Sequence, residues 1–112
     1  MATGGRGGST VEAQRSDDAA CCERMAVVFR ALGNGTRVGI VRRILGEEMC
    51  VGELQDELGC SQPNISQHLA VLRDRGVVTP HRDGNRVCYT LADVRIADLL
   101  LLAEDIFEVR NH

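Results

Sequence analysis

The sequence predicts a mainly α-helical domain with one β-hairpin near its C-terminal end. In four segments between residues 16 and 76, apolar side chains recur at helical spacing, and each segment is followed by a glycine. From residue 77 the pattern changes to two β-rich runs separated by an Asp-Gly pair, which is a strong hairpin signal. A last helix, apolar on nearly every face, is expected at about 93–109.

The length of 112 residues suits a single domain with one core. Residues 1–15 are rich in Gly, Ser and Thr and are predicted to form a disordered N-terminal tail, so that the folded domain comprises residues 16–112. No run approaches the roughly 20 apolar residues of a membrane-spanning helix. Because no targeting pattern is visible either, we expect a cytoplasmic protein that has no membrane partner.

The first two predicted helices have clear N-terminal signals. Ser16 is the expected N-cap of the first, whose apolar stripe ends at Leu32 and contains Cys21. The second is expected to begin at Asn34 or Thr36 and to end near residue 45. Its predicted buried side chains are Val38, Val41 and Leu45.

The next two helices and the hairpin predict a winged helix-turn-helix. A short helix with Val51, Leu54 and Leu58 on one face is followed by a break at 59–60. Ser61 is expected to cap the fourth helix, which buries Ile65, Leu69 and Leu72. Strands are expected at 77–79 and 86–91, and this order of elements is typical of that fold. The apolar last helix has more surface than one small core can cover, so we expect a homodimer.

A DNA-reading surface is predicted on the fourth helix and the hairpin. The net charge is −3 and all 13 basic residues are arginine, yet segment 61–90 holds four arginines against two acids. Short hydrogen-bonding side chains on the fourth helix suit base edges and phosphates in double-stranded DNA, although an ordinary solvated helix face is the alternative. The predicted DNA-binding residues are Ser61, Gln62, Asn64, Ser66, Gln67, His68, Arg73, His81, Arg82 and Arg86.

Several segments together resemble one known family. They are ALGNGTRVGIVRRIL, EEMCVGEL, LGCSQPNISQHLAVLRDRGVV and DGNRVCYTLAD, which fall between Ala31 and Asp93. They closely resemble the ArsR/SmtB family of bacterial metal- and thiol-responsive repressors. The resemblance implies a homodimeric winged-helix repressor that blocks its own promoter until an inducer binds. Gly35 departs from the proline that the family often has there.

Five cysteines are many for this chain, and we expect them to be reduced. The odd number and the lack of any CxxC pair argue against a disulfide framework. The resemblance places Cys50 where the family's metal-binding third helix carries a cysteine. A thiol at a helix N-terminus favours the thiolate that metals and persulfides need. The alternative is a small buried residue at a helix start.

Two ligand sets known in the family are incomplete here. The zinc site of the last helix retains Asp93, but Arg95, Ile106 and Val109 stand where its other ligands are expected. Some persulfide sensors of the family pair the third-helix thiol with a cysteine at the end of the last helix. This chain has none there.

The remaining thiols suggest a site formed by Cys21, Cys22 and Cys50, within one subunit or between two. Three thiolates suit soft ions, and we favour arsenite as inducer, with antimonite, cadmium and lead as alternatives and no organic cofactor. The alternative is that Cys21 belongs to the apolar stripe and Cys22 is incidental. Cys60 is interpreted as structural, and Cys88 lies too near the DNA side for the predicted metal site.

Three functions compete for these residues. The first is a repressor that releases its operator when thiolates bind arsenite or a similar ion. The second is a repressor that senses persulfide or oxidant, with Cys50 attacked and one of Cys21, Cys22 or Cys88 resolving it. The third, a thiol enzyme or plain dimerisation module, is disfavoured because no cysteine has a recognisable catalytic partner set in the sequence.

Overall fold

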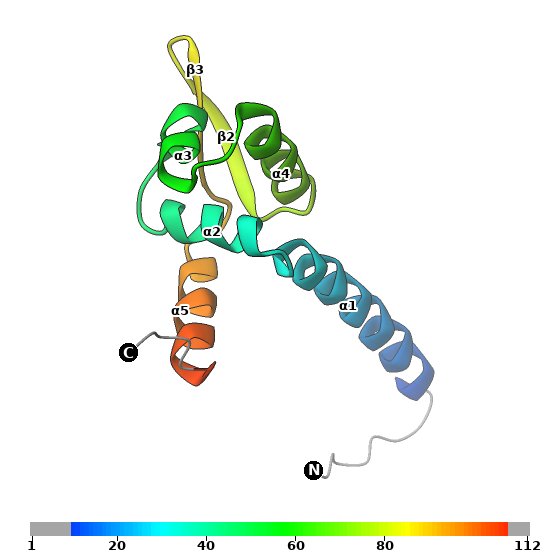
Figure 1. Cartoon of the computed structure of the whole chain (residues 1–112). Helices are drawn as coiled ribbons and strands as arrows, with labels where there is room; N and C mark the ends of the chain where they lie inside the picture. The colour runs from blue at the N-terminus through cyan, green and yellow to red at the C-terminus, as the bar shows by residue number, and fades with distance from the viewer. Residues whose placement is uncertain (1–9, 108–112) are drawn as a thin grey trace.

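The computed structural model describes residues 10–107 and has the predicted winged helix-turn-helix arrangement. Helices α2, α3 and α4 and the sheet form one body, whereas α1 and α5 extend away from it (Figure 1). The elements, in chain order, are α1 Thr10–Leu32, α2 Gly35–Ile44, β1 Met49–Cys50, α3 Val51–Leu58, α4 Gln62–Asp74, β2 Val78–Asp83, β3 Arg86–Leu91 and α5 Arg95–Phe107.

The boundaries of the outer helices differ from the prediction. Helix α1 begins at Thr10 rather than Ser16, so residues 10–15 of the predicted disordered tail are helical. The sequence from 12 to 15, EAQR, consists of good helix formers, and these extend the helix beyond its apolar stripe. Helix α5 occupies 95–107 of the predicted 93–109. Residues 1–9 and 108–112 lie outside the described part of the chain.

The apolar core lies between α2, α3, α4 and one face of the sheet. The predicted burial of Val41, Leu54, Ile65, Leu69 and Leu72 is confirmed, since each is fully buried. In α2 the prediction was only partly correct, because Ile40 and Ile44 are buried whereas Val38 and Leu45 are half-buried, Leu45 packing against the core cluster. The stripe of α2 is rotated toward α3 and α4, which leaves Val38 and Leu45 in a groove between α1 and α5.

Two side-chain N-caps and one glycine in the left-handed conformation fix where α2, α3 and α4 begin or end. The side chain of Asn34 accepts a hydrogen bond from the backbone N–H of Arg37 (3.1 Å), so Asn34 is the N-cap of α2. Ser61 caps α4 by accepting from the N–H of Asn64 (3.4 Å). Between α3 and α4, Gly59 has φ +67°, a conformation that glycine adopts without steric cost.

The sheet contains a strand that the sequence did not predict. Its order is β1-β3-β2, with both pairs antiparallel, so β3 is central. Strand β1 has only two residues and no readable alternation. Strand β2 continues to Asp83, past the predicted end at residue 79, and the hairpin turns through 84–85. Pro80 is tolerated because β2 is an edge strand, where its missing N–H removes no ladder bond.

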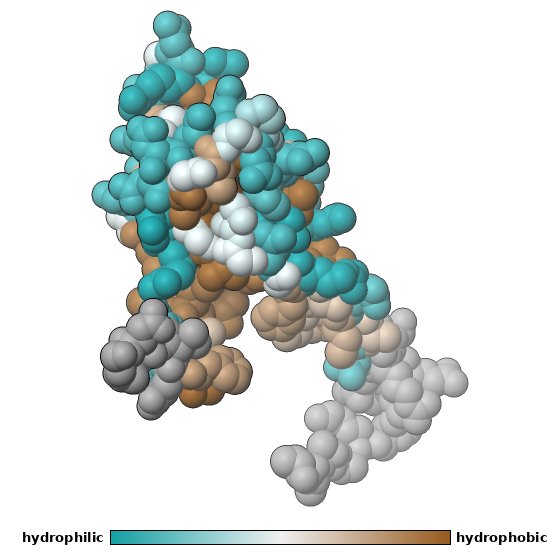
Figure 2. Space-filling view, viewed as in Figure 1, coloured by the Kyte–Doolittle hydropathy of each residue, from teal (hydrophilic) through white to brown (hydrophobic). Residues whose placement is uncertain are grey.

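The two outer helices expose large apolar side chains. Figure 2 shows this apolar surface on the parts of both helices that extend from the body. The exposed residues are Met25, Phe29, Leu99, Leu101, Leu102, Ile106 and Phe107. Within residues 10–107, no helix is both long enough and apolar enough to cross a membrane.

One valine pair tests the position of the core. Val77 is 1% exposed and Val94 is 81% exposed. We expect Val77→Ala to lower the free energy of unfolding by about 2 kcal/mol, because two methyl-sized groups leave the core and a cavity remains. The same substitution at Val94 should change it by less than about 0.5 kcal/mol. Urea denaturation of both variants at one protein concentration measures the difference, and equal losses would contradict the assigned core.

Candidate functional site

Helix α4 presents a polar surface at its N-terminal half. Ser61 and the side chains of Gln62, Asn64, Ser66 and Gln67 are exposed. On the opposite side of the same turns, Ile65 and Leu69 are fully buried. Burial of this apolar stripe therefore fixes which polar groups of α4 face outward, and these include five of the predicted DNA-binding residues.

His68 has an intramolecular partner that the sequence did not predict. It is half-buried, and Nη1 of Arg37 lies 3.3 Å from its Nδ1. Because a guanidinium can only donate, Nδ1 accepts this hydrogen bond. The Nε of Arg37 also donates to the carbonyl of Ala31 (2.6 Å), so this arginine connects the end of α1 to α4.

The other predicted DNA-binding residues are exposed. Within the described chain, some of them form surface ion pairs and the rest form no ion pair. Arg73 pairs with its neighbour Asp74 (3.1 Å), and Arg86 lies 3.9 Å from Asp83 across the hairpin. The Nε2 of His81 lies 2.9 Å from a carboxylate oxygen of Glu48. Arg82 is exposed on β2. Exposed ion pairs contribute little to stability, so these groups exchange partners readily.

The structure contradicts the expectation that all cysteines are reduced. Cys50 and Cys88 form a disulfide, with their Cα atoms 3.8 Å apart. The two are direct partners in the antiparallel register of β1 and β3. Cys88 was left out of the predicted metal site as too near the DNA side, and it was one of three cysteines named as a redox partner of Cys50. The unpredicted strand β1 brings Cys50 and Cys88 together. Both are buried, at 4% and 0% exposure.

The disulfide joins the helix-turn-helix to the wing. Cys50 is the last residue of β1 and the N-cap of α3, and its backbone N–H donates to a carboxylate oxygen of Glu53 (2.8 Å). Cys88 lies in the strand that carries the wing. A covalent bond thus connects the first residue of the helix-turn-helix to the hairpin, 38 residues later in the chain.

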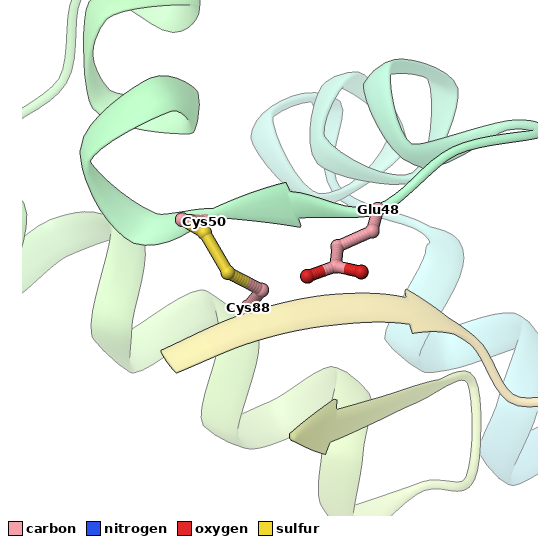
Figure 3. Close-up of side chains that lie close together, drawn as sticks. All are labelled: Glu48, Cys50 and Cys88. Atoms are coloured by element: carbon pink, nitrogen blue, oxygen red, sulfur yellow. A yellow bond between two sulfur atoms is a disulfide. The ribbon is translucent and has the colours of Figure 1, made fainter. Parts of the chain in front are cut away.

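A carboxylate lies beside this cysteine pair. Glu48, Cys50 and Cys88 place their ligand atoms within 4.8 Å of one another (Figure 3). Among residues 17–107, this is the one group of three or more metal-ligating side chains at such distances. The predicted combination of Cys21, Cys22 and Cys50 is thus not assembled within one chain, and both Cys21 and Cys22 are exposed on α1.

Two further residues that the sequence singled out have simple surroundings. Cys60 is half-buried in the turn, and its Sγ donates to the carbonyl of Leu58 at 3.6 Å, which agrees with a structural role. Asp93 accepts hydrogen bonds from Nη2, Nε and the backbone N–H of Arg95. These bonds, the side-chain ones first, lower the pKa of Asp93 to about 2. The side chain of Arg95 thus occupies the carboxylate of Asp93 at the start of α5.

Comparisons with known proteins agree with this fold. The profile described as bacterial regulatory protein, arsR family, matches residues 34–79. A probable mercury resistance operon repressor of Streptomyces lividans is 43% identical over 75 residues, which is 67% of this chain and 60% of that protein. The chain thus spans less than two thirds of that relative's length.

Other relatives are covered more fully. The transcriptional activator HlyU of Vibrio cholerae is 33% identical over 75% of this chain and 78% of its own. The structure of reduced HlyU superposes with a TM-score of 0.72 at 31% identity, covering 84% of this chain and 96% of that one.

A solution structure of a homodimeric winged helix-turn-helix domain from Mycobacterium bovis gives a TM-score of 0.77 at 27% identity, covering 85% of this chain and 94% of that one. The shared fold, the matching segment and the well-covered relatives lead to one conclusion. The chain belongs to the ArsR family of bacterial regulatory proteins.

Proposed function

We propose that this chain is a cytoplasmic, homodimeric transcriptional repressor that senses oxidants or persulfides through Cys50 and Cys88. The observation that carries the proposal is the bond between these two residues, because it connects the helix-turn-helix to the wing. Both elements are expected to contact operator DNA. A bond that forms and breaks between them is suited to change how they fit one duplex.

The DNA-binding part of the proposal rests on α4 and the hairpin. The exposed amides and hydroxyls of α4 are of the types that read base edges in the major groove. The wing adds Arg82 and Arg86, which suit phosphates. We assign to DNA contact the ten residues predicted from the sequence, with His68 acting from its position beside Arg37.

The dimer rests on the apolar surfaces of α1 and α5. A groove between them is lined by Phe29, Leu32, Leu100 and Phe107, and more apolar side chains lie exposed along α5. Exposed surface of this kind in a small domain is favourably covered by a second copy. The related Mycobacterium bovis domain is homodimeric. Two copies present two α4 helices to successive half-sites.

The proposed chemistry needs an oxidant of the peroxide or persulfide class. With a peroxide, the Cys50 thiolate attacks one oxygen and becomes a sulfenic acid while hydroxide leaves. The Cys88 thiol then displaces that hydroxyl as water, which closes the disulfide. With a low-molecular-weight persulfide, Cys50 takes the outer sulfur and a thiol leaves. Cys88 then attacks the Sγ of Cys50 and releases hydrosulfide.

A second candidate is sensing of a soft metal ion through thiolates. Cys21 and Cys22 are both free and exposed on α1, where a second subunit is expected to pack. We propose that they meet the reduced Cys50 of a partner chain and bind arsenite, with cadmium or lead as alternatives. The Streptomyces relative is a probable mercury resistance repressor, which favours metal sensing in this part of the family.

Thiol counting tests the first step. The chain has five cysteines, and three of them are free in the structure. After mild oxidation and denaturation without reductant, we expect three reactive thiols in the wild type and four in Cys88→Ser, because Cys50 then lacks its partner. Titration with a disulfide reagent measures this. Five thiols in the oxidised wild type would contradict the disulfide.

Operator binding tests the switch. We expect peroxide or a persulfide donor to weaken binding of the reduced wild type to a promoter duplex by about 10-fold or more, within the usual range of allosteric coupling. Cys88→Ser should bind the duplex but stay insensitive to both reagents. Fluorescence anisotropy of a labelled duplex measures the affinities.

The matched control is Cys21→Ser/Cys22→Ser, which keeps the disulfide and should respond like the wild type. Oxidation that leaves wild-type affinity unchanged, or that raises it, sinks the redox proposal. If arsenite releases the wild type but not this double variant, the second candidate is supported instead.

Charge placed on α5 tests the dimer. Leu102 is 56% exposed, and we expect Leu102→Glu to convert the dimer to monomer because two carboxylates would be buried at the interface. Light scattering after gel filtration measures the mass. A monomeric wild type at micromolar concentration would contradict the proposed interface.

A further inference from the structure

We infer that the reduced protein holds a thiophilic divalent cation of the zinc–cadmium class between Cys50, Cys88 and Glu48, with His81 paired to the carboxylate of Glu48. The inference extends the proposed function and rests on it in one respect, that the disulfide is reversibly reduced. The site differs from the predicted three-thiolate site, because it uses the wing and no residue of α1.

The sheet register places the two cysteines and His81 in one row. Cys88 on the central strand pairs with Cys50 of β1 on one side and with His81 of β2 on the other. Directly opposite residues of antiparallel strands project to the same face of a sheet. The next row, Met49, Tyr89 and Pro80, faces the other way, and Met49 and Tyr89 belong to the apolar core. The two cysteines and His81 therefore lie on the face turned away from the core.

Glu48 completes the group from the residue before β1. It lies two positions before Cys50, and Figure 3 shows its carboxylate beside the two sulfur atoms. The ligand atoms of Glu48, Cys50 and Cys88 lie within 4.8 Å of one another. The Nε2 of His81 lies 2.9 Å from Oε2 of Glu48. His81 lies outside the group of ligand atoms within 4.8 Å, so its imidazole holds the carboxylate of Glu48 as an outer contact. Two thiolates and one carboxylate are donors that suit zinc or cadmium.

Burial differs between the two cysteines and the pair formed by Glu48 and His81. The cysteines are 4% and 0% exposed, whereas the side chains of Glu48 and His81 are each 40% exposed. A cation would therefore enter past the carboxylate and the imidazole and then reach the shielded sulfurs. The hydrogen bond from the N–H of Cys50 to Glu53 (2.8 Å) holds the backbone of one ligand, as outer contacts do at metal sites.

Metal binding and oxidation would both use the sulfur lone pairs of the Cys50 and Cys88 thiolates, so each would hinder the other. A coordinated thiolate shares its lone pair with the cation, so it attacks a peroxide less readily. When oxidation does proceed, two thiolates, one peroxide and two protons give one disulfide and two waters, and the cation leaves unchanged. The bound cation would therefore protect the reduced pair and be released by its oxidation.

Cadmium titration of the full reduced chain without oxygen tests the site. The probe is Cd²⁺ alone, followed by its thiolate charge-transfer absorption and by competition with a chelator. We expect one ion per chain at this site. Affinity should fall about 100-fold or more in Cys88→Ser and by about 10- to 100-fold in Glu48→Gln and His81→Ala. It should be unchanged in Cys60→Ser, because this free thiol belongs to neither proposed site.

The exposed positions keep the test decisive if a cysteine variant fails to fold. Glu48→Gln and His81→Ala alter surface side chains, and wild-type affinity in both of them overturns the site. Wild-type affinity in a folded Cys88→Ser, or loss of binding in Cys60→Ser, overturns it as well. Redox-insensitive DNA binding would instead defeat the proposed function while leaving cadmium stoichiometry intact, so the two failures are distinguishable.

Discussion

The pairing of β1 with β3 is the contact on which the candidate site depends. Strand β1 has only two residues, yet it holds the segment between α2 and α3 against the central strand of the sheet. Without this pairing, Cys50 would be an ordinary helix N-cap and Cys88 an isolated strand cysteine. With it, the start of the helix-turn-helix and the base of the wing share one row of side chains. The candidate chemistry therefore follows from sheet register rather than from a motif.

The apolar core makes that register strict. Met49 and Tyr89 pair across β1 and β3 and both point into the core. A shift of one residue would move these side chains to the outer face and bring the cysteines inward, at a large cost in buried apolar area. The core thus fixes the positions of Cys50 and Cys88, although neither sulfur belongs to the main apolar cluster.

Local patterns predicted most of the fold, but they could not choose Cys88 among the three cysteines named as possible partners of Cys50. Ser61, Leu69 and Leu72 were assigned correctly because capping and helical periodicity act within a few residues. A two-residue strand has no period, and the partner of Cys50 lies 38 residues away. Only the three-dimensional register joins them. The Asp-Gly pair located the hairpin, but edge position, not sequence, explains why β2 continues through Pro80.

The two candidate sensing sites would act on DNA by different routes. The cysteine pair lies between α3 and the wing, so its oxidation acts directly on elements that are proposed to contact DNA. A site at Cys21 and Cys22 would act through α1. The side chain of Arg37 donates hydrogen bonds both to a backbone carbonyl at the end of α1 and to His68 of α4, so it connects the two helices. Loss of the Arg37 guanidinium should therefore weaken a response that begins on α1 and leave one that begins at Cys88 largely intact. This difference in route separates the two mechanisms physically, even though both involve Cys50.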